Sequence, residues 1–107
     1  MRILTGLVML AALGATAASA QPGRVSDAGY LQAARCAGLA SSANLGASDG
    51  AAMSAWLKSQ APGRMSYILD KADEIQRKAK RDADRADDFA KPRLSAELTG
   101  ACAQFKS

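Results

Sequence analysis

Two cysteines, Cys36 and Cys102, are the residues of this chain best suited to covalent chemistry, and they lie 66 positions apart. Redox-active cysteines usually have two residues between them, as in Cys-x-x-Cys, or lie in an electropositive pocket. The chain also has no histidine that could activate a thiol. In an oxidising compartment, two thiols form one intramolecular disulfide by default. The sequence therefore predicts a structural bridge between them, with a redox pair and an intermolecular link as the alternatives.

Catalytic chemistry has few candidates in this sequence. Without histidine the chain lacks the commonest general base and every Ser-His or Cys-His nucleophile arrangement. Carboxylates such as Asp70, Glu74 and Glu97 are available, but acid-base hydrolysis needs two of them in a shaped pocket. We therefore predict no catalytic residue, no cofactor and a protein that is not an enzyme.

Four aspartates gather late in the chain, in the order Asp82, Asp84, Asp87 and Asp88. Calcium sites collect several oxygens from a loop that turns sharply at a glycine. These aspartates instead alternate with arginines in a segment that has helical periodicity. A salt-bridged surface is the prediction, and no metal site is expected.

Three residues around one predicted turn, Met53, Trp56 and Tyr67, could form a surface that binds a partner. Tryptophan and tyrosine supply much of the binding energy at protein interfaces. A single tryptophan in a small domain, however, more often belongs to the core. The sequence leaves Trp56 with both interpretations, core or interface.

The first twenty residues match a secretory signal peptide. Arg2 precedes an apolar stretch over residues 3–18, and Ala18-Ser19-Ala20 supplies the small residues of a cleavage site. A membrane-spanning helix needs about 20 strongly apolar residues, so this stretch is too short for a span. We predict cleavage after Ala20 and a periplasmic or secreted protein, and an uncleaved N-terminal helix is the alternative.

Residues 21–107 then form the mature chain, with a short disordered arm over 21–25, a single helical domain over 26–107 and no transmembrane helix. The full chain has 14 basic and 10 acidic side chains, a formal charge of +4. This excess predicts weak attraction to an acidic partner or an anionic membrane surface. The basic residues lack the interleaved aromatics that stack bases, so no specific nucleic-acid binding is expected.

Four segments have helical periodicity, and we expect helices over 26–43, 49–60, 64–90 and from Pro92 to near the end of the chain. Ser26 is suited to cap the first, and Pro62-Gly63 breaks the chain before the third. Few β-branched apolar residues and no alternating run argue against a sheet. The predicted fold is all-α: a small bundle of about four helices, with the first and last joined by the disulfide.

The longest predicted helix, 64–90, has one charged and one apolar face. Opposite charges four residues apart support it in water, in the pairs Asp73–Arg77, Glu74–Lys78 and Lys80–Asp84. Its apolar stripe begins at Met65 and ends at Phe89, with alanines between. This stripe either docks within the domain or packs against the helix of a partner.

These features predict a small exported helical protein that acts as a protein-interaction module in the cell envelope, such as an inhibitor, an immunity protein or a small chaperone. In size, expected compartment and cysteine count, the chain is similar to small periplasmic helical proteins with one disulfide. Acid-stress chaperones of the HdeA type and helical immunity proteins belong to that group, although the basic charge and wide cysteine spacing here differ from the chaperones. The alternative is a carrier of a small ligand or ion, or an unconventional enzyme.

Overall fold

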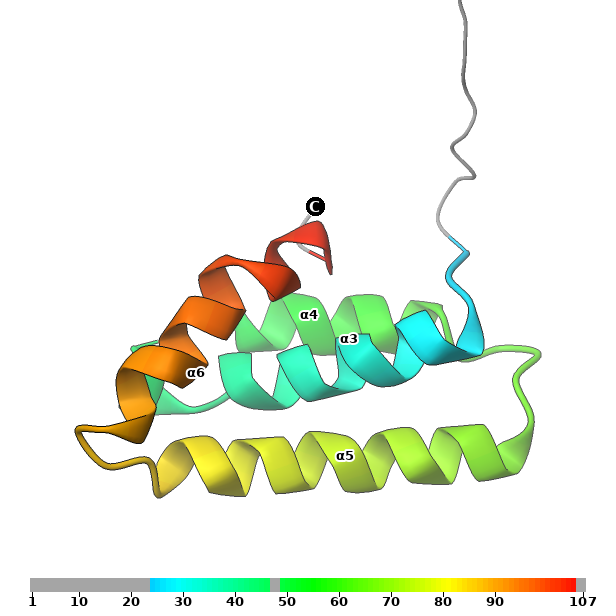
Figure 1. Cartoon of the computed structure of the whole chain (residues 1–107). Helices are drawn as coiled ribbons and strands as arrows, with labels where there is room; N and C mark the ends of the chain where they lie inside the picture. Colours follow the sequence, from blue (N-terminus) through cyan, green and yellow to red (C-terminus); the bar gives the residue numbers. More distant parts are fainter. Residues whose placement is uncertain (1–23, 47–48, 106–107) are drawn as a thin grey trace, which may run out of the picture.

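The computed structural model describes residues 24–46 and 49–105, so the predicted signal peptide over 1–20 lies outside the described part. The described residues form four α-helices, which confirms the predicted all-α fold (Figure 1). Their bounds are α3 (Asp27–Ala40), α4 (Gly50–Ser59), α5 (Ser66–Asp84) and α6 (Ala90–Thr99), with short 3₁₀ segments at Ala43–Leu45 and Ala101–Phe105. None of the described helices is both long and apolar enough to cross a membrane.

Helix α3 lies between α4 and α5 and contacts both. It runs in the same direction as α5 and opposite to α4 (Figure 1). Helix α6 crosses one end of the bundle and carries the C-terminal 3₁₀ segment back against α3. Because α3 touches the other three helices, its side chains decide how closely they pack.

Helices α3 and α5 bury mostly small side chains. These are Ala33, Ala34, Ala37, Gly38 and Ala40 on α3, and Ala72, Ala79 and Ala83 on α5. At Gly38 the two helices come so close that a Cβ atom would lie 2.2 Å from the Gln76 carbonyl oxygen and 2.8 Å from the Ala79 Cβ. Small residues therefore set the distance between α3 and α5.

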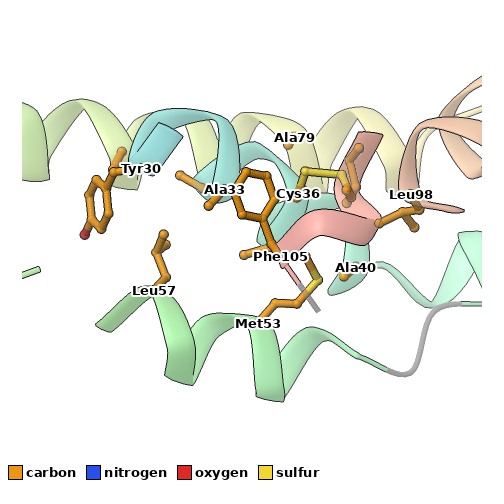
Figure 2. Close-up of a cluster of buried hydrophobic side chains, with 14 of the residues drawn as sticks. Tyr30, Ala33, Cys36, Ala40, Met53, Leu57, Ala79, Leu98 and Phe105 are labelled. Carbon is orange, nitrogen blue, oxygen red and sulfur yellow. A yellow bond between two sulfur atoms is a disulfide. The ribbon is translucent and has the colours of Figure 1, made fainter. Parts of the chain in front are cut away.

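Larger side chains fill the space between α3, α4 and the C-terminal segment (Figure 2). They are Tyr30, Leu39, Met53, Leu57, Leu98 and Phe105. The Cys36–Cys102 disulfide lies in this core with an S–S distance of 2.05 Å, and its two residues are 1% and 0% exposed. The predicted bridge between the first and last helical segments is thus confirmed. Because α6 ends at Thr99, Cys102 lies in the 3₁₀ segment and not in the continuous last helix that we predicted.

Helix α3 begins where the sequence predicts, since the Ser26 hydroxyl accepts a hydrogen bond from the Gly29 amide at 3.1 Å. It ends at Ala40 rather than at 43. Beyond this end, the Ser42 hydroxyl donates to the Asp84 carboxylate at 2.6 Å and ties the chain to the far end of α5. The predicted break after α4 is also present, and Gly63 has a left-handed φ of 87° that glycine adopts at little cost.

The long helix is shorter than predicted, because it ends at Asp84 instead of at 90. The Asn44 side-chain amide donates to the carbonyl oxygens of Ala83 and Ala86, at 2.9 and 3.1 Å. The last carbonyl oxygens of a helix have no partner inside it, so these bonds satisfy the end of α5. The asparagine that ends α5 comes from a loop far away in the sequence, and helical periodicity therefore could not reveal it.

Helix α6 begins at Ala90, before the predicted start at Pro92. Asp87 caps it, since its Oδ1 atom accepts hydrogen bonds from the amides of Phe89 and Ala90 at 3.1 and 2.8 Å. Pro92 falls in the first turn, where a missing amide costs no helical hydrogen bond. Asp87 is thus a helix start and not part of a helical acidic surface.

Two predictions about the surface of the long helix need correction. Met65 and Phe89 lie outside α5, so they take no part in an apolar stripe and are 66% and 77% exposed. Lys78 pairs with Asp82 at 3.0 Å and not with Glu74, whereas the other two predicted pairs are formed. The exposed side of α5 is therefore salt-bridged, as expected, with one of the three predicted pairs replaced.

Candidate functional site

The three residues predicted to bind a partner occupy different environments. Met53 is 3% exposed and belongs to the core below the disulfide (Figure 2). Trp56 is half-buried on the same helix, and its ring centroid lies 5.6 Å from that of Phe105. Tyr67 is 63% exposed on α5, whose main neighbour is α3. Met53 and Trp56 thus support the C-terminal segment, and Tyr67 belongs to another surface.

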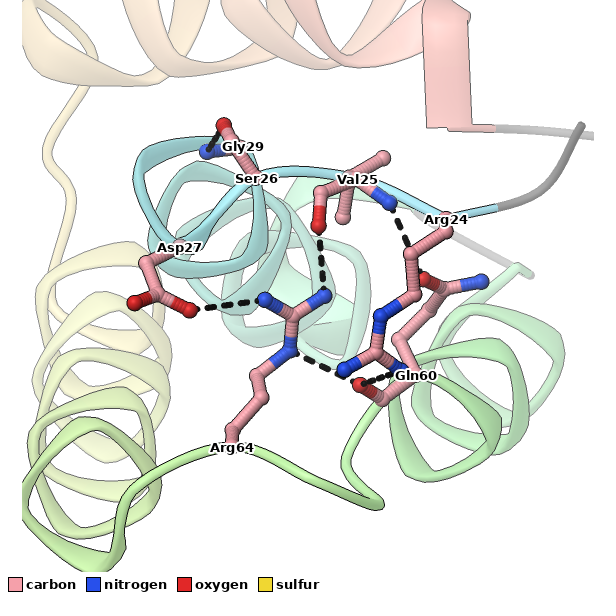
Figure 3. A network of polar contacts seen from close by, with 7 residues as sticks. All are labelled: Arg24, Val25, Ser26, Asp27, Gly29, Gln60 and Arg64. Atoms are coloured by element: carbon pink, nitrogen blue, oxygen red, sulfur yellow. Dashed lines mark hydrogen bonds and ion pairs between the residues drawn. The ribbon is translucent and has the colours of Figure 1, made fainter. Parts of the chain in front are cut away.

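A buried arginine joins the start of α3 to the end of α4 (Figure 3). The Arg64 side chain is only 3% exposed and uses its whole guanidinium. Its Nε donates to the Gln60 carbonyl oxygen at 2.8 Å, its Nη2 to the Val25 carbonyl oxygen at 2.7 Å and its Nη1 to the Asp27 carboxylate at 2.8 Å. The guanidinium also lies over the Tyr30 ring, 4.4 Å from its centroid. Arg64 therefore fixes the position of Tyr30 and of the residues at the start of α3.

The same network holds the chain just before α3. Gln60 accepts a hydrogen bond from the Val25 amide on its Oε1 atom at 3.2 Å, and from Arg24 on its carbonyl oxygen at 3.4 Å. The disorder predicted for 21–25 therefore does not extend to Arg24 and Val25, and residues 21–23 lie outside the described part. A hydrogen-bond partner from α4 was not foreseeable from the sequence of the arm itself.

Replacing Arg64 by lysine is expected to lower the free energy of unfolding by about 2 kcal/mol. Lysine keeps the positive charge, but its single ammonium group cannot donate to Gln60, Val25 and Asp27 in the geometry of the guanidinium. Urea unfolding followed by circular dichroism measures this loss. Arg77→Lys is the matched control, since the Arg77 side chain is 67% exposed in a surface ion pair and should change stability by less than about 0.5 kcal/mol. Equal effects of the two variants would show that the Arg64 network contributes no stability.

A second polar contact joins α3 to α6. Arg35 donates from Nε and Nη2 to the two carboxylate oxygens of Glu97, at 2.6 and 2.9 Å. This hydrogen-bonded carboxylate raises the pKa of Arg35. At the neighbouring end of α5, the Lys80 ammonium and the Ser42 hydroxyl hold the pKa of Asp84 below its ordinary value. These contacts thus tie α3 to α6, and the chain just after α3 to the end of α5.

An open hollow lies between α3 and α5, and we call it the α3–α5 groove. It is lined by Leu31, Gln32, Arg35, Ile75, Lys78 and Ala79 and has a volume of about 430 Å³. The short side chain of Ala79 leaves space between Leu31 and Ile75, which are both half-buried at the edge of the core. The floor is therefore apolar, and two cationic side chains stand at its rim.

The side of α5 that carries the groove continues toward the start of the helix. Tyr67, Lys71, Ile75 and Lys78 follow one another at spacings of four, four and three residues and therefore share one side of the helix. Tyr67, the exposed residue of the predicted partner-binding group, thus lies on the same side of α5 as the groove but outside its lining, about 12 Å along the helix from Ile75. This side of α5 therefore carries both the groove and an exposed aromatic residue, a type enriched at protein interfaces.

A second and smaller hollow lies on the opposite side of α5, between this helix and α4. Its volume is about 250 Å³. Its polar lining residues are Tyr30, Ser54, Lys58, Asp73 and Gln76, and its apolar ones include Leu57 and Leu69. We call it the α4–α5 cleft.

No known family model, curated protein or solved structure matches this chain. Arg64, Leu31 and Ile75 were not among the predicted site residues. Arg64 follows directly on the Pro62-Gly63 turn, a signal that predicts a surface loop rather than a buried cation. Ile75 fits the apolar stripe of its helix, so the pattern assigns it to the core, whereas Leu31 lies beside the alanine-rich stripe of its own helix.

Proposed function

We propose that this chain is an exported protein-interaction module that binds a partner protein through the α3–α5 groove. The observation that carries the proposal is the apolar hollow of about 430 Å³ between Leu31 and Ile75. An apolar hollow at the surface is the kind of site that takes an anchoring side chain of a partner. Tyr67, which is 63% exposed, lies further along the same side of α5 and offers a second, aromatic contact to a partner that covers both.

The chemistry of the groove specifies the partner. The floor favours a large apolar side chain, and the rim favours acidic residues because Arg35 and Lys78 stand there. Lys78 forms an exposed ion pair with Asp82, which is worth little and exchanges easily with another carboxylate. Arg35 is held by Glu97 through two hydrogen bonds and contributes its positive charge from a fixed position. The net positive charge of the chain adds long-range attraction. We therefore propose a net-negative protein of the cell envelope as the partner.

Export is part of this proposal. It rests on the tripartite pattern of residues 1–20, and the buried Cys36–Cys102 disulfide supports it because such bridges persist in oxidising compartments. Helices α3 and α5 pack closely at Gly38, so the groove between them is preorganised. Preorganisation favours one specific partner, as for an inhibitor or an immunity protein, over the varied clients of a chaperone.

A photo-reactive residue placed at Gln32 tests the proposed interface in the organism that encodes the protein. Gln32 is exposed at the rim of the groove, and Ala51, exposed on α4, is the matched control position. We expect a covalent adduct with one net-negative envelope protein from Gln32 and not from Ala51. Adding Ile75→Glu should abolish the adduct, because it places a charge on the apolar floor.

The control for this experiment is the fold of the Ile75→Glu variant, measured by circular dichroism with the disulfide intact. Three results would contradict the proposal: no adduct from Gln32, the same adducts from both positions, or an adduct that survives in folded Ile75→Glu protein. If Ile75→Glu does not fold, Leu31→Glu serves at the same groove.

A further inference from the structure

The α4–α5 cleft has the size of a site for a small molecule. Its volume of about 250 Å³ exceeds the roughly 150 Å³ of a cavity that accepts a benzene ring. Leu57 comes from α4, and Leu69 and Ala72 come from α5, so both long walls are apolar. An apolar body with a small polar head fits such a space.

The polar groups of the cleft stand on opposite walls. Lys58 belongs to α4, and among the described residues its ammonium forms no ion pair and no side-chain hydrogen bond. Asp73 belongs to α5 and shares only its Oδ2 atom with Arg77, at 2.9 Å. Gln76 donates its amide NH₂ to the Ser54 hydroxyl at 3.2 Å, which turns its carbonyl oxygen away from Ser54. The lining thus includes a cation from α4 and an anion and an amide from α5.

The floor of the cleft holds a hydroxyl group that still lacks a partner in the described part of the chain. Tyr30 is 5% exposed, lines the cleft and points from α3 toward α4 beside Leu57 (Figure 2). Arg64 covers its ring at 4.4 Å and fixes it, but no described residue forms a hydrogen bond with its hydroxyl. Buried tyrosine hydroxyls normally have a hydrogen-bond partner. The Tyr30 hydroxyl is therefore a group that a ligand would satisfy.

We infer that the α4–α5 cleft binds a small zwitterion with an apolar side chain, of the α-amino acid class. The Lys58 ammonium pairs with the ligand carboxylate, and the Asp73 carboxylate pairs with the ligand ammonium. The Tyr30 hydroxyl donates a hydrogen bond to the ligand, whose apolar side chain packs against Leu57 and Leu69. This site lies on the other side of α5 from the α3–α5 groove, so its test is independent of the proposed function.

The opposite charges of Lys58 and Asp73 favour a zwitterion over simpler ligands. A plain amine would bring a second cation to Lys58, and a plain carboxylate would bring a second anion to Asp73. A zwitterion satisfies both walls at once, because its two charges match those of Lys58 and Asp73. The limited volume and the aliphatic walls further favour a side chain of the size of leucine over one of the size of tryptophan.

Titration of the oxidised, isotope-labelled protein with L-leucine, followed by nuclear magnetic resonance, tests the inference. We expect saturable shifts at the residues that line the cleft. L-leucinamide, which lacks the carboxylate, and 4-methylpentanoate, which lacks the ammonium, should each bind at least about tenfold more weakly. No saturable shift with L-leucine, or equal affinity for either analogue, would overturn the assignment.

Variants locate the binding within the cleft. Lys58→Met and Asp73→Asn should each weaken L-leucine binding about tenfold or more, and Tyr30→Phe, which removes only the hydroxyl, several-fold. Lys91→Met and Asp88→Asn make the same changes on α6 and on the turn before it, outside the lining, and should leave affinity unchanged. Unchanged affinity in folded Lys58→Met and Asp73→Asn proteins would overturn the inference. If one of these does not fold, the other decides alone.

Discussion

Replacing Cys36 and Cys102 together by alanine is expected to lower the free energy of unfolding by about 4 kcal/mol and the melting temperature by roughly 20 °C. The bridge closes a loop with a sequence separation of 66 residues, so in the chain-entropy model it restricts the unfolded chain strongly. Both cysteines are also fully buried, and the smaller alanines leave space in the core. This is the largest single stability effect that we expect.

The effect should concentrate at the C-terminal segment. The disulfide holds the 3₁₀ segment Ala101–Phe105 against α3, where Phe105 packs on Trp56. Without the bridge this segment retains the contacts of one buried aromatic ring, while the packing of α3 on α5 is unaffected. Faster amide exchange and proteolysis should therefore begin near the C-terminus.

Thermal unfolding of the oxidised protein, with and without reductant, measures the effect. The matched control is the double alanine variant, whose melting temperature should not change when reductant is added. Reduction of the wild-type protein must be shown by its free thiols. If its melting temperature then falls by less than a few degrees, the result would contradict the stabilising role of the bridge.

Gly38→Ala is expected to destabilise the fold by about 3 kcal/mol, although helix propensity alone would predict a gain of about 1 kcal/mol. The new Cβ atom would lie 2.2 Å from the Gln76 carbonyl oxygen, which is backbone and cannot rotate away. Helices α3 and α5 would have to move apart, and the contacts of their buried alanines would weaken. The sign of the change therefore separates the two effects.

Urea unfolding of Gly38→Ala and Gly29→Ala proteins provides the comparison. Gly29 lies in the same helix, and a Cβ atom there would meet the Val25 side chain at 3.2 Å, a contact that a small shift relieves. We expect a change of less than about 1 kcal/mol at Gly29. A Gly38→Ala protein as stable as the wild type would show that the close approach of α3 and α5 is not required for stability.

The fold class and the disulfide could be predicted because they depend on local periodicity and on a count of two cysteines. Helix ends were less predictable where the residue that caps the helix is distant in sequence. The start of α3 uses Ser26, which is adjacent, whereas the end of α5 uses Asn44 from another loop. The start of α6 could have been found, since Asp87 precedes Ala90 at the spacing of a cap.

The candidate sites could be predicted only in part. Tyr67 is exposed, but its grouping with Met53 and Trp56 assumed that neighbours of one turn share a surface. The groove depends on Leu31 of α3 and Ile75 of α5, which line one hollow only once the two helices are packed together. The cleft likewise brings Lys58 of α4 and Asp73 of α5 into one lining, which no periodicity within one helix reveals.

Native mass spectrometry of the protein from the envelope fraction of its own host, without reductant, tests the proposed function most directly. We expect a chain that begins at Gln21, is two hydrogens lighter than the reduced form, and is held in a complex with a net-negative protein. The same preparation from folded Ile75→Glu protein should lack the complex. A chain that retains residues 1–20, or a complex that persists in the Ile75→Glu protein, would contradict export or binding through the α3–α5 groove, respectively.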